Sequence, residues 1–172
     1  VTNRSRSYVN KVTQKISGEI FKNYKVSKVV RSKDNVRIFI ENEYFDYDQI
    51  VLATHADQSL NLIENPTQQE KKLLQKFDYV PNVAILHSDE TLMPKRRRAW
   101  SSWNSISNGN QTCVTYWLNR LQNLEVKKNY FLTLNPIYEI SETKTLKKVM
   151  FTHPYLNSAN IKIQNELHTL QG

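Results

Sequence analysis

The first third of the chain contains two short runs rich in β-branched apolar residues, the second of them alternating, which is typical of a β-hairpin. Residues 25–31 and 36–41 are two such extended runs, and Asp34-Asn35 supplies a turn between them. Val36, Ile38 and Ile40 give the second run a period of two, so we expect one face of the hairpin to be buried. Residues 44–47 predict a further short strand.

A continuous apolar run follows at residues 50–53, Ile-Val-Leu-Ala. Because it does not alternate, it predicts a strand that is covered on both faces. Thr54 and His55 come directly after this strand, at the end where ligands bind in open α/β sheets. The alternative interpretation is local, with Thr54 or Asp57 capping the helix that follows.

The rest of the chain predicts helices packed on an antiparallel sheet. A helix is expected at 56–63, and Thr67-Gln-Gln-Glu70 is a capping box that opens another. Strands are expected at 79–87, 99–106, 111–119, 130–134 and 146–153, with helices at both ends of the chain, from Ser5 or Ser7 to about Ser17 and over 157–170. The predicted fold class is therefore α+β.

Four large aromatic residues lie on two of these strands, which we expect to pair: Trp100, Trp103, Tyr116 and Trp117. The separation of Trp100 and Trp103 is odd, so a regular strand would point them to opposite faces. One would belong to the core, and the other would line the second face of the sheet. Aromatic side chains on an accessible face suit an apolar or planar ligand, while core packing is the simpler interpretation.

The net charge is +8, and the densest basic run is Lys95-Arg96-Arg97-Arg98. The simplest interpretation is a solvated turn between strands. Two alternatives stay open, namely an anion-binding patch and a basic loop that faces an acidic substrate or a membrane surface. No nucleic-acid-binding motif accompanies the run, so a nucleic-acid partner is not expected.

Cys113 is the only cysteine, so no internal disulfide can form, and we expect a reducing, cytoplasmic location. Its place in an apolar, alternating strand predicts a small core residue. No apolar run approaches the roughly 20 residues of a membrane-spanning helix, and the polar N-terminus does not predict a signal peptide.

Several kinds of site are not supported by any spacing in the sequence. The four histidines are isolated from one another and from other ligands, so no metal site is expected. There is no Gly-x-Ser-x-Gly nucleophile elbow. With three glycines in the whole chain, no phosphate-cradling loop is expected either.

Five segments occur in the same order in one group of flavoproteins. They are residues 48–57, 79–89, 93–104, 114–122 and 132–136. On these segments the chain resembles the bacterial predicted FAD/NAD(P)-binding proteins of the flavin-containing amine oxidase superfamily. Monoamine oxidases, protoporphyrinogen oxidases and carotenoid desaturases are more distant relatives. The hairpin followed by a strand ending in Ala53-Thr54 also resembles the end of the cofactor domain in such proteins.

The resemblance implies an FAD-dependent oxidoreductase with a small-molecule, apolar substrate. Residues 1–55 would be part of the FAD-binding domain, and residues 56–172 would be a substrate-domain unit whose sheet roofs the isoalloxazine. The implied cofactor-binding residues are Val26, Val29, Thr54 and His55. The implied substrate-lining residues are Asn82, Trp100, Trp103 and Tyr116.

The chain departs from the family pattern in two respects. The Gly-x-Gly-x-x-Gly motif and the C-terminal flavin segment of the family have no counterpart here, so we expect the chain alone to be inactive and a separate Rossmann-domain chain to be a candidate partner. Asn82 aligns with the lysine that amine oxidases carry near the flavin, so amine oxidation is not implied. The alternative function is a non-enzymatic remnant or binding module whose basic loop contacts an anionic surface or partner.

Overall fold

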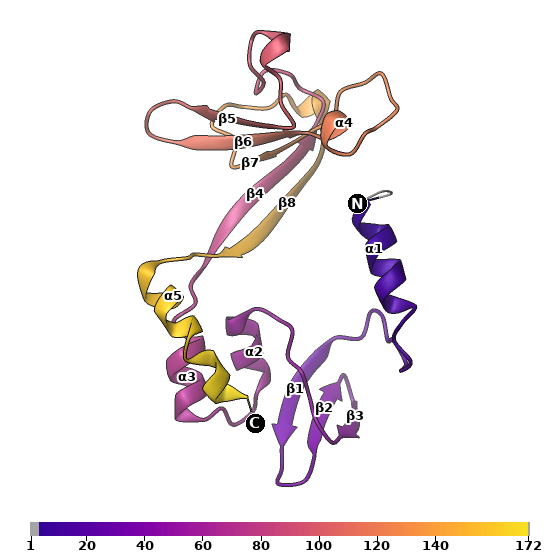
Figure 1. The fold of residues 1–172 in the computed structure, drawn as a ribbon, viewed down its shortest axis with the longest axis vertical. Coiled ribbons are helices and arrows are strands. Elements are labelled where there is room, and N and C mark those ends of the chain that lie inside the picture. Colours follow the sequence, from indigo (N-terminus) through magenta and orange to yellow (C-terminus); the bar gives the residue numbers. More distant parts are fainter. Residues whose placement is uncertain (1–3, 172) are drawn as a thin grey trace. The chain divides into compact units, whose positions relative to one another are not determined.

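Two antiparallel β-sheets with flanking helices make up the chain in the computed structural model, which describes residues 4–171. Residues 80–153 pack as one unit, here called the five-strand unit. Residues 6–79 pack with residues 154–171 as a second unit, here called the three-strand unit (Figure 1). The predicted α+β class is confirmed. The predicted division at residue 55 separates the chain by function and stays a prediction. The two units described here are defined by packing, and their bounds differ from it.

The three-strand unit contains the predicted hairpin and its short third strand. Strands β1 (Val26–Arg31), β2 (Val36–Ile40) and β3 (Glu43–Tyr47) follow one another in the sheet as antiparallel neighbours. The β1–β2 register shifts between Val26 and Lys28, which marks a bulge at the start of β1. The strand predictions for this region are confirmed to within a residue or two.

Helices α2 (Ala56–Leu62), α3 (Gln68–Leu74) and α5 (Ser158–Gln164) belong to the same unit, followed by the 3₁₀ turn η3 (Leu167–Leu170). The predicted capping box is present: the Glu70 N–H donates to Thr67 Oγ1 at 3.1 Å, and the Thr67 N–H donates to Glu70 Oε2 at 2.7 Å. The predicted helix 157–170 is divided in two, and Gln69 Nε2 ties η3 to α3 through a 2.7 Å hydrogen bond to Thr169 Oγ1.

Helix α1 (Arg4–Thr13) ends before the predicted limit near Ser17. The Thr13 hydroxyl donates to the carbonyls of Val9 and Asn10, each at 3.0 Å. The Gln14 amide still bonds four residues back to Asn10, but the amides of Lys15 and Ile16 bond three residues back, to Val12 and Thr13. Such side-chain bonds to the preceding turn compete with continued α-helix, so the helix tightens and stops here.

The predicted buried strand at residues 50–53 is wrong. These residues form no strand, and Val51 is 90% exposed. An extended segment becomes a strand only when a neighbour pairs with its backbone, and no strand within residues 4–171 pairs with this one. Ile50 and Leu52 are half-buried.

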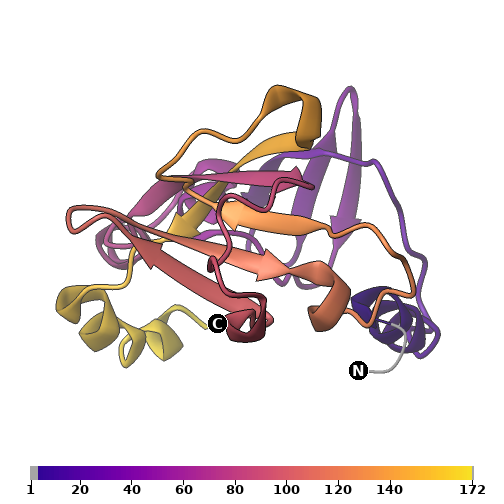
Figure 2. The ribbon, with the colours of Figure 1, turned by 90° about the horizontal axis from the view of Figure 1, so that it is seen from above.

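In the five-strand unit the strand order is β5-β6-β7-β4-β8 (Figures 1 and 2). The strands are β4 (Tyr79–His87), β5 (Trp103–Ser107), β6 (Thr112–Trp117), β7 (Phe131–Leu134) and β8 (Thr145–Pro154). Between them lie the short helices η1 (Arg97–Ala99), α4 (Leu118–Leu121) and η2 (Glu142–Lys144). A turn closed by a hydrogen bond from the Asn108 amide to the Gln111 carbonyl joins β5 to β6, with Gly109 at a φ of 94° that suits glycine.

The predicted strand at 99–106 begins four residues late, at Trp103. Residues 97–99 form the η1 turn instead, and Trp100 directly after it is 7% exposed. Burial of this indole fixes the chain before β5 starts, which a pattern of apolar positions does not reveal.

One face of the five-stranded sheet carries the core of this unit. Two neighbouring clusters pack on it, the first made of Ile85, Leu92, Cys113 and Ile140, and the second of Met93, Trp100 and Phe131 with Trp117 against it. Cys113 is 1% exposed, so its predicted role as a small core residue is confirmed.

An ion pair between Arg31 and the largely buried carboxylate of Glu70 joins β1 to α3 in the three-strand unit. Arg31 donates from Nη1 to Glu70 Oε1 at 2.6 Å and from Nη2 to Glu70 Oε2 at 2.9 Å. The hydrogen bond from Arg31, followed by that from the Thr67 amide, lowers the pKa of the Glu70 carboxyl despite its partial burial. Glu70 thus holds the start of α3 and its contact with β1 at once.

Replacing Glu70 with glutamine is expected to lower the stability of the three-strand unit by about 1–2 kcal/mol, because a two-pronged charged contact becomes a single neutral one. Faster hydrogen exchange of the β1 and α3 amides would measure the loss. The pKa of Glu70 is lower in the folded chain than in the unfolded chain. The stabilisation is therefore fully present at a pH above the unfolded-state pKa, and it is lost as the pH falls through the folded-state pKa.

The matched control is Glu64→Gln. Glu64 bonds Lys28 at 2.8 Å, but both side chains are about 40% exposed, so a loss of a few tenths of a kcal/mol is expected. Equal exchange rates in the two variants would contradict the role given to Glu70.

Candidate functional site

Two of the predicted substrate-lining residues face each other on neighbouring strands. Trp103 of β5 lies directly across from Tyr116 of β6. Their rings meet edge to face, with centroids 5.8 Å apart and planes at 78°. The Trp103 side chain is 67% exposed, and that of Tyr116 is half-buried. The pair therefore presents a large aromatic surface away from the core.

The registers extend this surface across four strands. Tyr116 pairs with Leu132 of β7, which pairs with Leu86 of β4. A parallel row contains Ser105, Val114, Leu134 and Ala84. These residues alternate with the core residues, so they point to the other side of the sheet. We call this surface, from Trp103 to Leu86 and from Val114 to Leu134, the open sheet face; Ala84 at its edge is buried.

Asn82 lies two residues before Ala84 on β4, so strand alternation places it on the same side as the open sheet face. Its amide is engaged: Nδ2 donates to the Val80 carbonyl at 3.0 Å, and Oδ1 accepts from Asn135 Nδ2 at 2.7 Å. Asn135 in turn accepts from the Val83 amide at 2.9 Å. The side chain is therefore fixed rather than free to turn.

Trp100 lies apart from these three residues, inside the second core cluster. Its Nε1 donates to the Pro94 carbonyl at 2.8 Å. Its ring packs edge to face on Trp117, with centroids 5.2 Å apart, and on Phe131 at 5.7 Å. The structure thus brings Asn82, Trp103 and Tyr116 to one side of the sheet and puts Trp100 in the core.

Two of the predicted cofactor-side residues lie around a hollow in the three-strand unit. Val29 of β1 is 1% exposed and lines this hollow of about 320 Å³ together with Ile50, Leu52, Ser59 and other residues. Thr54 reaches it through a 2.7 Å hydrogen bond between its Oγ1 and Ser59 Oγ. Val26, before the bulge of β1, is half-buried and pairs with Ile40.

His55 is held by an aromatic contact. Its ring stacks on Tyr79 with centroids 4.5 Å apart and planes at 15°. The Tyr79 hydroxyl accepts from the Ala56 amide at 2.7 Å, so both residues fix the start of α2. His55 occupies the N-cap position of α2 without a side-chain cap, and neither Thr54 nor Asp57 occupies it. The capping alternative is therefore wrong.

A buried polar row crosses the core face of the five-stranded sheet, and sequence analysis missed it. His87 Nε2 lies 2.8 Å from Thr133 Oγ1, which lies 2.8 Å from Thr115 Oγ1. Asn104 continues the row with a 3.4 Å bond to the Thr115 carbonyl. All four side chains are 6% exposed or less. Polar residues at core-facing strand positions are the sequence signal that could have revealed them.

Hydrogen bonds at the end of this row determine the protonation of His87 and of the neighbouring Asp89. The Asp89 amide donates to His87 Nδ1 at 3.2 Å, so Nδ1 carries no proton and Nε2 donates to Thr133. Burial lowers the pKa of the His87 imidazole. Burial raises the pKa of the Asp89 carboxyl, but hydrogen bonds from the amides of Ser141 and Thr91 and from Lys144 outweigh it and lower that pKa. His87 is thus a neutral, structural histidine.

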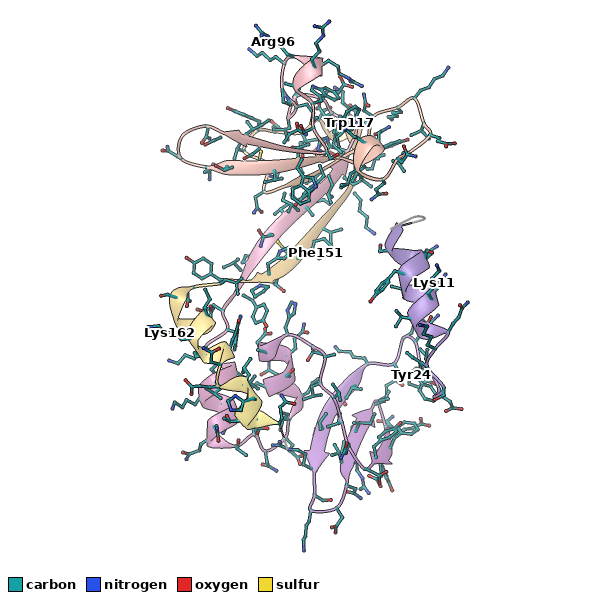
Figure 3. The ribbon with its side chains drawn as sticks, viewed as in Figure 1. Lys11, Tyr24, Arg96, Trp117, Phe151 and Lys162 are labelled. Atoms are coloured by element: carbon teal, nitrogen blue, oxygen red, sulfur yellow. The ribbon has the colours of Figure 1, made fainter. Side chains whose placement is uncertain are left out.

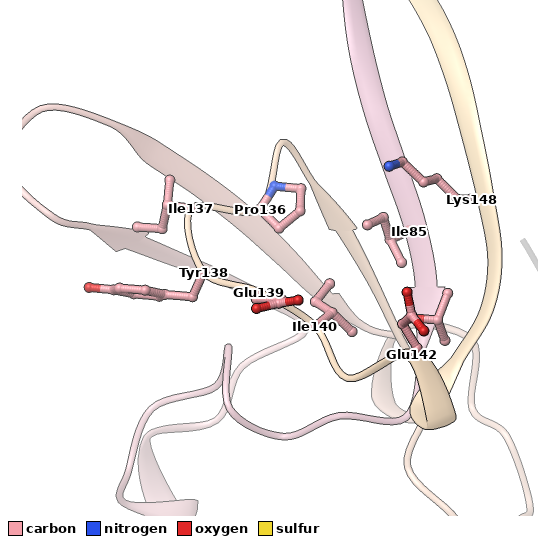
Figure 4. Close-up of a pocket in the computed structure, with 9 residues that line it drawn as sticks. Ile85, Pro136, Ile137, Tyr138, Glu139, Ile140, Glu142 and Lys148 are labelled. Atoms are coloured by element: carbon pink, nitrogen blue, oxygen red, sulfur yellow. The ribbon is translucent and has the colours of Figure 1, made fainter.

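A second hollow lies beside the loop that leads from β7 to η2 (Figure 4). It measures about 540 Å³, and its apolar lining includes Ile85, Ile137 and Ile140. Lys148 of β8 lies near Ile85, while Glu139 and Glu142 come from the loop. Both signs of charge line this hollow, so it favours no single ligand class.

Residues 4–171 contain neither a metal-binding cluster nor a membrane-spanning helix. No three His, Cys, Asp or Glu side chains come together there in a way that could hold a metal ion. None of the helices in that range has the length and apolar character to cross a bilayer.

No family model and no curated protein matches the sequence. Several solved structures are similar in fold, and two of them illustrate the likeness. A CLA-producing fatty acid isomerase from P. acnes matches with a TM-score of 0.66 and 12% identity over 98% of this chain. A protein assigned as a protoporphyrinogen oxidase from Exiguobacterium sp. 255-15 matches with a TM-score of 0.53 and 12% identity over 96%. In each case the chain spans 44% of the other protein's length.

Proposed function

We propose that this chain is the substrate-facing part of an FAD-dependent, amine oxidase-like oxidoreductase that acts on an apolar substrate. The observation that carries the proposal is the open sheet face, where Trp103 and Tyr116 meet edge to face beside Leu132 and Leu86. A wide aromatic and aliphatic surface on a sheet suits a planar ring system or a hydrocarbon chain.

The likeness to two longer proteins supports the same proposal. Protoporphyrinogen oxidases are among the relatives that the sequence resemblance implies, and one of the two similar structures carries that assignment. The other is a fatty acid isomerase. A fatty acid has an apolar chain of the kind that the open sheet face could cover, so a lipid-like substrate is the class we favour.

The chain's own residues fit only part of FAD. The open sheet face suits the isoalloxazine. The hollow beside Val29 and Thr54, whose lining includes both apolar side chains and the Arg31–Glu70 pair, suits a ring-shaped portion of the cofactor that carries polar atoms. The pyrophosphate needs closely approaching backbone amides of a glycine-rich loop. A Cβ atom added to Gly18 would meet no other atom within 4 Å, and Gly109 serves a hairpin turn, so neither glycine forms such a cradle.

FAD binding would therefore require a Rossmann-type domain supplied by another segment of polypeptide, and a separate Rossmann-domain chain is the partner we propose. The flavin would supply the redox chemistry. The residues of this chain would bind the substrate, orient it and exclude water. Asn82 cannot act as a base, because its amide is neutral and is already bonded to Asn135 and Val80, which argues against an amine oxidase mechanism.

The decisive measurement is a visible absorption spectrum of the protein isolated from its native cells, with an intact mass of the same sample. Flavin absorption together with a co-purifying Rossmann-domain chain, or with a heavier single chain, is the expected result. A colourless protein at the mass of 172 residues would contradict the proposal and favour a non-enzymatic binding module.

Binding of the substrate class can be tested separately with a long-chain fatty acid as the probe. Tyr116→Ala is expected to weaken its binding by roughly tenfold, since most of an aromatic contact on the open sheet face is lost. Isothermal titration of the flavin-containing protein would measure the change. Tyr44→Ala removes an exposed tyrosine from β3 and should bind the probe normally; equal affinities in both variants would exclude the open sheet face.

A further inference from the structure

Residues 95–98, which lead into the η1 turn, present four consecutive basic side chains to solvent. Lys95, Arg96 and Arg98 are exposed, and within residues 4–171 none of them forms an ion pair. Figure 3 shows Arg96 at the outer end of the turn, directed away from the sheet. Three unpaired cations on one short turn repel one another, so their gathering is costly unless an anionic partner offsets it.

Arg97, the fourth member, is also exposed, but its guanidinium lies over two aromatic rings and fixes the turn. Its guanidinium lies 3.8 Å from the centroid of the Trp100 ring and 5.1 Å from that of Trp117. It also lies 3.6 Å from Glu90 and donates to Asn129 Oδ1 at 3.4 Å. Because Arg97 is anchored on two aromatic rings, its three neighbours are held on the outer side of a fixed support.

A second basic segment lies next to this turn. Asn129 joins the two, since it accepts from Arg97 and from Trp117 Nε1 and donates to Glu90 at 2.6 Å. Lys127 and Lys128 precede it and are exposed. The nearby Glu90 is already paired with Arg97, which leaves the outer cations without compensation. We call Lys95, Arg96, Arg98, Lys127 and Lys128 the basic surface.

We propose that the basic surface docks on an anionic phospholipid bilayer. A layer of lipid phosphates is a broad anionic plane, and juxtaposed lysines and arginines bind it without any shaped pocket. The proposal goes beyond the oxidoreductase function and does not depend on the flavin. It is compatible with a lipid-like substrate, which would be concentrated in such a bilayer.

Two features disfavour other anionic macromolecules. Single-stranded nucleic acid is usually held by exposed aromatic rings that stack on its bases, but the rings beneath this turn are occupied: Trp100 is 7% exposed and both indoles contact Arg97. A protein partner usually needs a large apolar or aromatic anchor at the centre of the contact. The turn from Pro94 to Ala99 supplies none.

The test is sedimentation of the 172-residue chain with vesicles of phosphatidylcholine, alone or with roughly 30 mol% phosphatidylglycerol. Binding to the anionic vesicles only is expected, and it should fall at high salt. The triple variant Lys95→Ala, Arg96→Ala, Arg98→Ala is expected to bind roughly 100-fold more weakly, at about 1 kcal/mol for each basic residue. Arg97 is kept so that the turn stays in place.

The matched control removes three exposed lysines from the region of α3: Lys71→Ala, Lys72→Ala and Lys76→Ala. It changes the net charge by the same amount and should bind anionic vesicles as the native chain does. Equal loss in the two triple variants, or no binding to anionic vesicles at all, would overturn the proposal. Tighter binding to an oligonucleotide, with the same dependence on residues 95, 96 and 98, would overturn it in favour of nucleic acid.

Discussion

Replacing Trp100 with alanine is expected to lower the free energy of unfolding of the five-strand unit by about 3–5 kcal/mol. The indole is 7% exposed and packs on Phe131 and Trp117. Truncation would leave a cavity beneath the η1 turn, remove the bond from Nε1 to the Pro94 carbonyl, and take away the ring on which Arg97 stacks. The apolar area of the indole is no longer buried, and its packing contacts are lost; both changes lower the free energy of unfolding.

The matched variant is Trp103→Ala, which removes the same side chain three residues later. Because Trp103 is 67% exposed and lies on the open sheet face, a loss below about 1 kcal/mol is expected. Urea unfolding followed by tryptophan fluorescence reports on this unit alone, since Trp100, Trp103 and Trp117 all lie in it. Similar losses for the two variants would mean that Trp100 is not a core residue.

The pair also tests how far the sequence defines the site. An odd spacing predicted opposite sides of a sheet for Trp100 and Trp103, and the two side chains do differ in this way. The expected reason is wrong, however, because Trp100 precedes β5 and is placed by the η1 turn. That turn depends on the contact of Arg97 with Asn129, 32 positions away, which leaves no periodic pattern in the sequence.

Local signals were the reliable ones. The β1–β2 hairpin and the capping box of α3 depend on residues at most 14 positions apart, Val26 and Ile40 being the most distant pair, and both were predicted from sequence. Residues 50–53 failed for the opposite reason. Their composition favours burial on both faces, but a strand requires a pairing neighbour, and Val51 is exposed where none is present among residues 4–171.

The buried polar row is another non-local feature. The alternation of His87 with Ile85 indicates a core-facing position, but the sequence does not identify the side chains that would bond the imidazole there. Only the β4–β7 pairing brings Thr133 to its Nε2, and only the β6–β7 pairing brings Thr115 to Thr133. A buried histidine with both ring nitrogens bonded is costly to charge, and this gives the row a measurable consequence.

Acidification is expected to destabilise the five-strand unit through His87. Burial lowers the pKa of its imidazole below the ordinary value of 6.5. The unfolded chain therefore binds the proton first, so stability is at its full value above that pH and falls as the pH drops toward the folded pKa. A measurable loss of stability is therefore expected between about pH 7.5 and about pH 5.5, the window around the ordinary histidine value.

The variant His87→Gln isolates this contribution. Its amide can still donate to Thr133, but the Asp89 N–H loses its acceptor at Nδ1, so a baseline loss of about 1–3 kcal/mol is expected at about pH 7.5. Because glutamine does not titrate, the dependence on pH over this window should be flatter than in the native chain. His153→Gln, on the exposed part of β8, keeps His87 and should keep the native slope. Urea midpoints measured by tryptophan fluorescence at each pH test this expectation. If His87→Gln keeps the native dependence on pH, the acid sensitivity belongs to the carboxylates instead. The protonated imidazole would then be as well accommodated in the folded core as in water.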